Sequence, residues 1–161
     1  MSTFRDAPPD ELAALGQLLG RPLAGRCWVV VRRLDGRPVV IENEPHLRDG
    51  TPMPTLYWLV DPELNDAVSR LEGEGGVHRF EGLVDPDHLQ RTHDEYAKRR
   101  LEATVRVGPP QAAGGVGGTR TGVKCLHAHL ANFLVGNDDP VGALVASSVG
   151  TPDLKVESGR D

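Results

Sequence analysis

Hydrophobic positions near the N-terminus follow a helical spacing. The prolines and acidic residues of Pro8–Glu11 are typical of a helix start, and Gly20 supplies a stop. Between them, leucines recur every three or four residues: Leu12, Leu15, Leu18 and Leu19. This pattern predicts a short amphipathic helix.

Two apolar runs separated by a turn dipeptide follow. Cys27–Leu34 and Val39–Asn43 are rich in strand-forming residues, and Asp35-Gly36 lies between them. These features predict an antiparallel β-hairpin. The next short apolar run, Thr55–Val60, predicts a third strand.

Two helices are predicted where a capping Asp precedes a Pro. After Asp61-Pro62-Glu63, an apolar stripe predicts a helix that ends near Gly73–Gly76. That stripe consists of Leu64, Ala67, Val68 and Leu71. After Asp85-Pro86-Asp87 we predict a long charged helix to about Leu101, and we interpret its Lys98–Arg100 run as a solvated face.

The remaining pattern completes an α+β fold. We predict a strand over Thr104–Val107, a glycine-rich loop over Pro109–Gly122, a helix over Val123–Val135 and a last helix from Asp139-Pro140. Residues 1–10 are expected to be a flexible N-terminus, residues 11–150 a single domain, and residues 151–161 a frayed tail. A small antiparallel sheet, formed by the hairpin and one or two further strands, should pack with about five helices.

Composition excludes several classes of protein. In 161 residues, 39% are hydrophobic and 25% charged, as in ordinary globular domains. No apolar run is long enough to cross a bilayer and no secretory signal is recognisable, so we expect a cytoplasmic protein without a membrane partner. A net charge of -5 argues against general nucleic-acid binding, and the two cysteines are expected to be free thiols.

One stretch departs from this balance of charges. Residues 103–137 contain Arg106, Arg120 and Lys124 but no Asp or Glu. Within it, a glycine-rich loop leads directly into a predicted helix, and glycines together with the free amides of a helix N-terminus favour an anion. We therefore predict a small anionic ligand held by Gly117, Gly118, Thr119, Arg120, Thr121, Gly122 and Lys124.

The loop matches neither standard nucleotide-binding motif. It has one residue too many between Gly122 and Lys124 for a Walker loop, and a G-x-G-x-x-G spacing would need glycine at Arg120. A flexible surface connection is the alternative interpretation.

The segment Cys125-Leu126-His127-Ala128-His129 has two possible geometries. On a helix, which its composition favours, Cys125 and His129 share a face and His127 points elsewhere. On a strand, all three would share one face and could bind zinc. Because no C-x-x-C or H-E-x-x-H motif is present, we do not predict a metal site.

The same residues are candidates for catalysis. Cys125 near a helix N-terminus is a candidate nucleophile, with His129 or His127 as its base. A buried free cysteine can equally be a small hydrophobic residue.

Four segments resemble the domain-of-unknown-function family 501, which is found in bacteria. They are Pro54–Leu59, Gly117–Arg120, Val123–His129 and Asp139–Gly142, and the resemblance extends over about residues 10–150. The family implies no activity. Its association with exopolyphosphatase-like and septum-formation genes favours phosphate-containing ligands over other anions.

Three hypotheses about function follow. The first is binding of a phosphorylated or polyanionic ligand at the glycine-rich loop, with phosphoester or phosphoanhydride hydrolysis that uses His127 or His129 as acid/base. The second is a non-enzymatic regulatory or adaptor protein with a protein partner. The third is a metal-binding protein that uses Cys125 and histidines. The sequence leaves the cofactor open.

The first hypothesis predicts that phosphate, polyphosphate or a nucleotide raises the melting temperature. A ligand at about 100 times its Kd adds roughly 2.7 kcal/mol, which corresponds to several degrees. Arg120→Ala should remove most of this shift while leaving the melting temperature of the ligand-free protein nearly unchanged. A panel of phosphorylated ligands that gives no shift, or the same shift in both proteins, would contradict the loop site.

Overall fold

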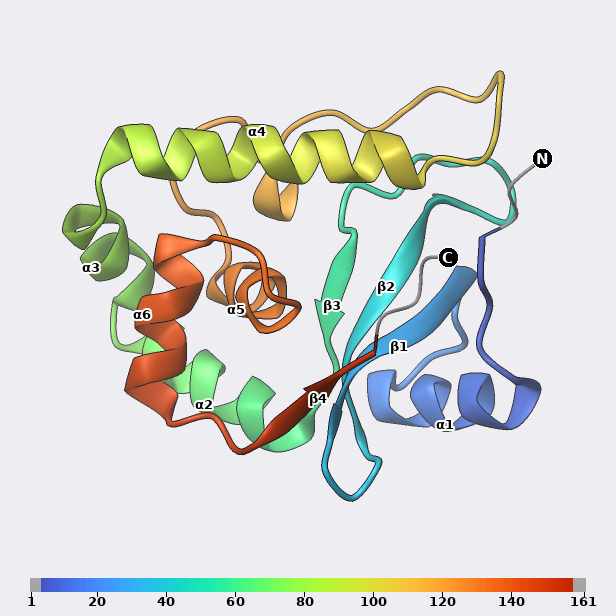
Figure 1. The fold of residues 1–161 in the computed structure, drawn as a ribbon, viewed down its shortest axis with the longest axis horizontal. Helices are drawn as coiled ribbons and strands as arrows, with labels where there is room; N and C mark the ends of the chain where they lie inside the picture. The colour runs from blue at the N-terminus through green and yellow to red at the C-terminus, as the bar shows by residue number, and fades with distance from the viewer. Residues whose placement is uncertain (1–3, 158–161) are drawn as a thin grey trace.

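An antiparallel sheet lies at the centre of the structure (Figure 1). The computed structural model describes residues 4–157, and over these residues the sheet has four strands in the order β3-β2-β1-β4. The strands are β1 (Gly25–Arg33), β2 (Pro38–Leu47), β3 (Tyr57–Leu59) and β4 (Leu154–Val156). The predicted hairpin is confirmed, with β1 paired to β2 across the Asp35-Gly36 turn.

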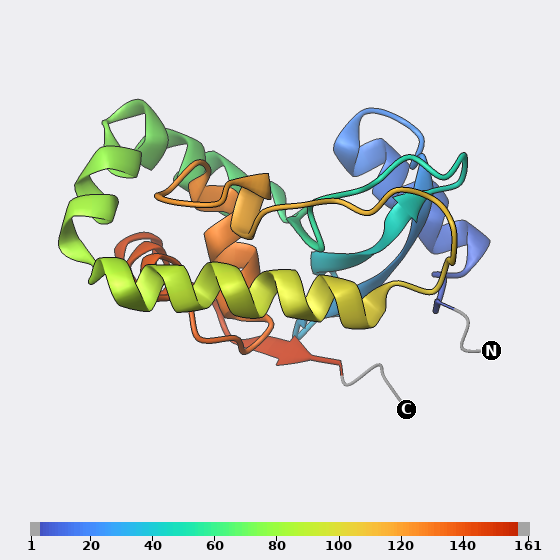
Figure 2. The ribbon, with the colours of Figure 1, turned by 90° about the horizontal axis from the view of Figure 1, so that it is seen from above.

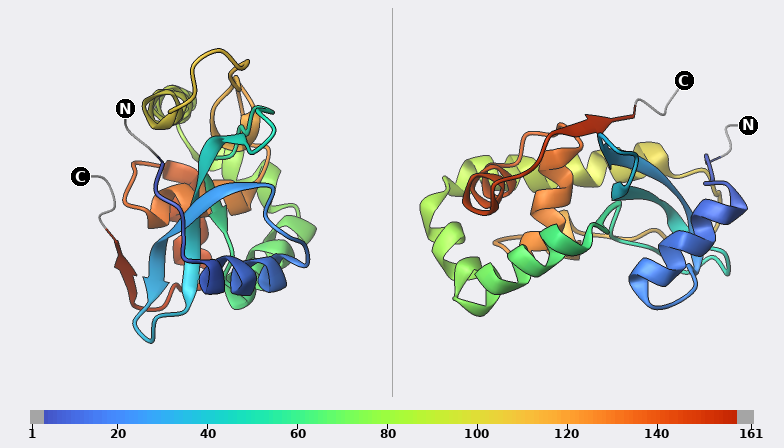
Figure 3. Two further views of the ribbon diagram at one scale, coloured as in Figure 1. Left: turned by 90° about the vertical axis from the view of Figure 1, so that its right-hand side faces the viewer. Right: turned by 90° about the horizontal axis from the view of Figure 1, so that it is seen from below.

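The sheet separates one helix from all the others (Figure 3). Cys27 and Val29 of β1 pack with Leu15 of α1 (Pro9–Leu19), whereas Trp28 and Val30 face the main core on the opposite side. Both faces of β1 are thus covered, which explains its continuous apolar run.

Six α-helices and a short 3-10 helix occur within residues 4–157. Besides α1 they are α2 (Pro62–Gly73), α3 (Gly76–Leu83), α4 (Pro86–Ala103), η1 (Val116–Gly118), α5 (Leu126–Leu134) and α6 (Pro140–Val149). The long helix α4 extends past both the other helices and the sheet (Figure 2). Asp61, Asp85 and Asp139 cap α2, α4 and α6 with their carboxylates, as the Asp-Pro pairs predicted. Within residues 4–157, every helix is too short or too polar to cross a membrane.

The predicted end of α2 is confirmed at Gly73. Gly75 has φ +82° and lets α3, a helix that the sequence did not predict, start at once. Three local predictions were wrong. Residues Thr104–Val107 form no strand. Helix α5 starts at Leu126 rather than Val123, because Cys125 has extended backbone. Arg100 is buried, not solvated, and its guanidinium donates to the carbonyls of Pro54, Ala112 and Gly114.

Both ends of the described chain are more ordered than predicted. Phe4 is buried in the main core, and the amide of Ala7 donates to the carbonyl of Cys27 at 2.7 Å. At the other end, Leu154–Val156 pair with β1 as strand β4, and Arg32 binds Glu157. The sequence pattern could not reveal this strand, because its partner is more than 100 residues away along the chain.

A buried carboxylate holds the segment after α4 against the sheet. Glu44 of β2 is fully buried and accepts hydrogen bonds from Arg26 and Arg106, each with a shortest contact of 2.8–2.9 Å. Burial alone would raise the pKa of Glu44, but these hydrogen bonds outweigh it and lower the pKa to about 2. The contribution of Glu44 to stability is therefore complete above pH 4.5, its ordinary value, and is lost as the pH falls toward 2.

We expect Glu44→Gln to lower the free energy of unfolding by about 3 kcal/mol, because two guanidinium groups lose their carboxylate. Urea denaturation at neutral pH measures this loss. Glu63→Gln is the matched control: Glu63 contacts Arg33, but its side chain is 72% exposed, so we expect less than about 1 kcal/mol. Equal losses in both variants would contradict this role of Glu44.

Candidate functional site

A pocket of about 440 Å³ lies where the edge strand β3 meets the start of α5. Its volume is typical of sites for small molecules. The residues that line it are Leu19, Arg21, Thr55, Tyr57, Trp58, Leu59, Gly117, Cys125, His127 and Ala128. Two of the predicted catalytic residues, Cys125 and His127, therefore face a space that a ligand can occupy.

Cys125 has the properties of a reactive thiol. It is half-buried, it directly precedes α5, and its Sγ lies 3.8 Å from Nδ1 of His127. Burial alone would raise the pKa of the thiol, but the hydrogen bond with His127 and the amide of Ala128 outweigh it, so the pKa is lowered. Cys27 is the opposite case, because it is fully buried and burial raises the pKa of its thiol to about 12.

Polar groups of α2 hold the ring of His127. Its Nε2 lies 3.3 Å from the carbonyl oxygen of Asn65 and 3.2 Å from Oγ of Ser69, while its Nδ1 lies 3.1 Å from Oε1 of Glu72. The carbonyl can only accept, so Nε2 carries a hydrogen. The hydrogen bond with Cys125 is the main cause that raises the pKa of His127; burial opposes it, and the charge of Glu72 adds to it. Both shifts run in the direction that favours a thiolate beside an imidazolium.

The sequence reasoning missed these three residues of α2. Asn65, Ser69 and Glu72 are spaced i, i+4 and i+7, which places them in one row along the helix. Each follows by one position a residue of the predicted apolar stripe, so a polar row beside that stripe was visible in the sequence. The sequence did not show which element this polar row would face.

His129 lies in the interior and not in the pocket lining. It is fully buried, and its Nδ1 lies 2.8 Å from the carboxylate of Asp139. Asp139 also accepts from Asn132 and from the amide of Gly142 at the start of α6. The prediction that Cys125 and His129 share a helical face was wrong, because Cys125 lies outside the helix and its sulfur contacts His127 instead.

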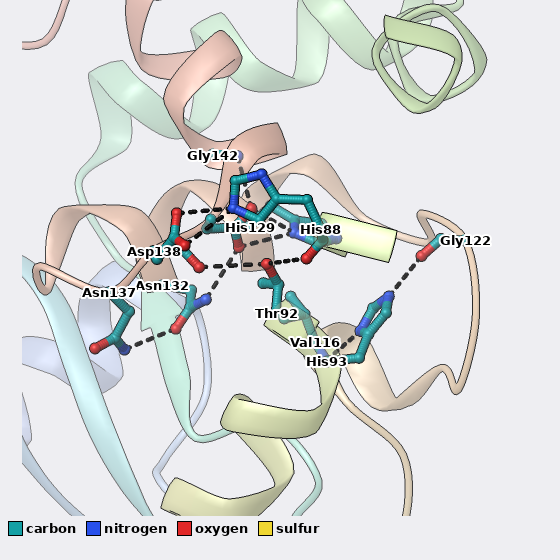
Figure 4. A network of polar contacts seen from close by, with 11 residues as sticks. His88, Thr92, His93, Val116, Gly122, His129, Asn132, Asn137, Asp138 and Gly142 are labelled. Carbon is teal, nitrogen blue, oxygen red and sulfur yellow. Dashed lines mark hydrogen bonds and ion pairs between the residues drawn. The ribbon is translucent and has the colours of Figure 1, made fainter. Parts of the chain in front are cut away.

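The glycine-rich loop is packed against α4. His93 accepts the amide of Val116 at Nδ1 (3.1 Å) and donates from Nε2 to the carbonyl of Gly122 (2.8 Å), as Figure 4 shows. A Cβ atom on Gly115 would lie 2.5 Å from His93. Glycine is therefore required there by the close approach of α4, which the interpretation as a flexible surface connection did not foresee.

Most of the predicted anion-binding residues face other partners or solvent. Arg120 and Lys124 are exposed, and the hydroxyl of Thr119 donates to the carbonyl of Thr121. Of the predicted set, which also includes Gly118 and Gly122, only Gly117 lines the pocket. Two carboxylates from elsewhere reach the amides of this region: Glu81 accepts from Val123 at 2.6 Å, and Glu72 accepts from Leu126 at 2.9 Å.

Glu72, Cys125 and His127 together also have the composition of a metal site. The ligand atoms of Glu72, Cys125 and His127 all lie within 4.8 Å of one another. Tetrahedral zinc with three protein ligands leaves one position open for water or substrate. No metal site was predicted from the sequence, because no metal-binding motif is present. Glu72 is remote from Cys125 along the chain and gave no local signal.

Comparison with known proteins identifies the family but no activity. The family model described as "Protein of unknown function (DUF501)" matches residues 29–147. The chain belongs to the DUF501 family. The matched region includes β2, β3, α2 and α5, and therefore most of the pocket lining together with the row of α2 that holds His127. No curated protein and no solved structure matches the chain.

His93 predicts a specific dependence of stability on pH. Burial lowers the pKa of His93 below its ordinary 6.5, so the folded protein disfavours the imidazolium. This contribution to stability is complete above pH 6.5 and is lost as the pH falls below it. Urea denaturation should show a smaller loss between pH 7 and pH 5 in His93→Gln than in the parent protein. A pH dependence that is unchanged by the substitution would contradict the assignment.

Proposed function

We propose that this protein is a cysteine-dependent hydrolase that acts on a small acyl compound bound beside Cys125. One observation supports it most: sulfur, imidazole and carboxylate converge at the pocket, where Sγ of Cys125 and Oε1 of Glu72 both approach Nδ1 of His127, at 3.8 Å and 3.1 Å. A nucleophile, an acid/base and an orienting group within reach of one another are the components of covalent catalysis.

The reaction would proceed in two steps. The thiolate of Cys125 adds to the carbonyl carbon of an ester, thioester or amide, and the imidazolium of His127 gives its proton to the leaving group, which leaves an acyl-thioenzyme. His127 then takes a proton from water, the resulting hydroxide attacks the thioester, and the acid product leaves as the thiolate and the imidazolium are restored. The carbonyl of Asn65 holds Nε2 through both steps, and the carboxylate of Glu72 holds Nδ1 whenever that nitrogen carries its proton.

The start of α5 supplies donors for the oxyanion of each step. The first amides of a helix lack partners within the helix, and their dipoles favour negative charge. Glu72 accepts from Leu126. The amide of His127, next in the first turn, is the donor that we assign to the oxyanion.

A carbonyl centre suits this pocket better than a phosphoryl centre. Phosphoryl transfer depends on several cations around the transferred group. Arg21 is the one permanently charged cation among the residues that line the pocket, and the walls are mainly apolar and aromatic. Phosphoester or phosphoanhydride hydrolysis at the glycine-rich loop stays a prediction that the Arg120 experiment addresses.

The proposal predicts a reactive Cys125 and an acyl-enzyme. The rate of alkylation by iodoacetamide should reach half its maximum at a pH below about 8.5, the ordinary pKa of a cysteine, and His127→Ala should move this midpoint upward. With p-nitrophenyl acetate, mass spectrometry should find one acetyl group on Cys125. Cys125→Ser should lower the rate of hydrolysis by about 100-fold or more.

Cys27→Ala is the matched control. Because Cys27 is fully buried, this variant should leave all three measurements unchanged. If Cys125 has an ordinary midpoint and forms no acyl-enzyme, the hydrolase proposal fails and a regulatory or adaptor protein becomes the better hypothesis.

A zinc centre is the second candidate, favoured by the convergence of Glu72, Cys125 and His127. The hydrogen bond from Nε2 of His127 to a backbone carbonyl is the support that zinc-bound histidines usually have. Protein purified with added zinc would then hold one equivalent, which both Cys125→Ser and Glu72→Gln would lose. If zinc protects Cys125 from iodoacetamide, the zinc centre replaces the hydrolase proposal, because a coordinated sulfur is not a free nucleophile.

A further inference from the structure

Arg21 is the one permanent cation in the lining of the Cys125 pocket. It follows α1, where Gly20 has φ +71° and the amide of Arg21 donates to the carbonyl of Gly16 at 3.0 Å. This arrangement is a standard helix end, and it holds the backbone of Arg21 at the rim of the pocket. The guanidinium carbon lies 5.9 Å from the ring centre of Trp58, another residue of the lining.

Arg21 differs from four arginines around the sheet in its pairing. Arg26, Arg32, Arg33 and Arg106 each bind at least one carboxylate. Within residues 4–157, Arg21 forms no ion pair with a carboxylate. A cation that lies on an aromatic ring in a concave surface, with no protein carboxylate to neutralise it, is suited to an anion from outside.

A second hollow continues from this point. It has a volume of about 190 Å³, and both Arg21 and Trp58 line it as well as the Cys125 pocket. Arg26 also lines this hollow, but its charge is neutralised by Glu44. Arg21 therefore stands at the junction of two spaces, where it can contact a group that extends away from Cys125.

We propose that the substrates of Cys125 are small anionic acyl compounds, whose carboxylate or phosphate group binds Arg21 while the reactive carbonyl lies at Cys125. This inference rests on the hydrolase proposal, to which it adds the substrate class. The apolar and aromatic walls between the two ends, including Tyr57, Trp58 and Leu59, accommodate a short hydrocarbon linker. A guanidinium pairs with either anion through parallel N–H donors.

Alkylating probes of graded length test the inference. The anionic probes are iodoacetate, N-iodoacetylglycine, N-iodoacetyl-β-alanine and N-iodoacetyl-aminomethylphosphonate. Each carboxylate is compared with its neutral carboxamide and the phosphonate with its neutral diester, and the rate at Cys125 is divided by the rate at a small free thiol. We expect at least one anionic probe to react faster than its neutral partner, and the carboxylate and phosphonate arms distinguish the two sources of charge.

Arg21→Gln should lower this preference by about tenfold, the effect of losing one charge-assisted contact, and Arg21→Lys should restore part of it. Neutral probes, which carry no charge to pair with the guanidinium, should show a much smaller change in rate in both variants. Arg120→Ala is the matched control for a nearby exposed arginine and should retain the parent's preference.

The outcomes separate the two proposals. If neutral probes react rapidly with Cys125 but Arg21→Gln leaves the preference for anions unchanged, the substrate class is wrong and the hydrolase proposal stands. If the preference disappears in Arg120→Ala and not in Arg21→Gln, the anion binds at the glycine-rich loop and the inference is overturned. If Cys125 reacts no faster than the free thiol with any probe, both proposals fail.

Discussion

The carboxylate of Glu72 is the interaction on which the candidate site depends, because its two oxygens act in different places. Oε2 accepts the amide of Leu126 and so satisfies the first residue of α5. Oε1 lies against the ring of His127 one residue later. A single side chain of α2 therefore sets where α5 begins and favours the charged state of the imidazole beside Cys125. The fold and the proposed chemistry are coupled at this residue.

The acid-free stretch of the chain receives carboxylates from other elements at several points. Residues 103–137 contribute no carboxylate, and the structure brings Glu72 and Glu81 to two of its amides, from α2 and α3. Glu44 of β2 plays the same part for Arg106. The local excess of positive charge and free donors is thus partly used in folding. Arg21 is a better candidate for binding a ligand anion than its sequence context suggests, because it lines the Cys125 pocket whereas Arg120 and Lys124 do not.

Two histidines of α5 belong to separate hydrogen-bond networks, one at the pocket and one in the interior. His127 faces the pocket and is held by α2, with a raised pKa. His129, one half-turn further, faces the interior and joins α5 to the capped start of α6 through Asp139. The ring centre of His93 lies 5.8 Å from that of His129, and His93 holds the glycine-rich loop at Val116 and at Gly122. These buried contacts orient α5, and the orientation of α5 determines where Cys125 points.

Local patterns in the sequence determined the elements whose causes are local. The Asp35-Gly36 hairpin and the Asp-Pro helix starts at Asp61, Asp85 and Asp139 are decided by residues within a few positions of one another, so the sequence predicted them. It also drew attention to Cys125 and His127. Tertiary structure decided the rest, because contacts across long separations have no local signal. It selected His127 over His129 as the partner of Cys125, added Asn65, Ser69 and Glu72 from α2, and brought Arg21 to the same pocket. Periodicity could not choose between the two histidines, since Cys125 has extended backbone and the helical period of 3.6 residues applies only from Leu126 onward.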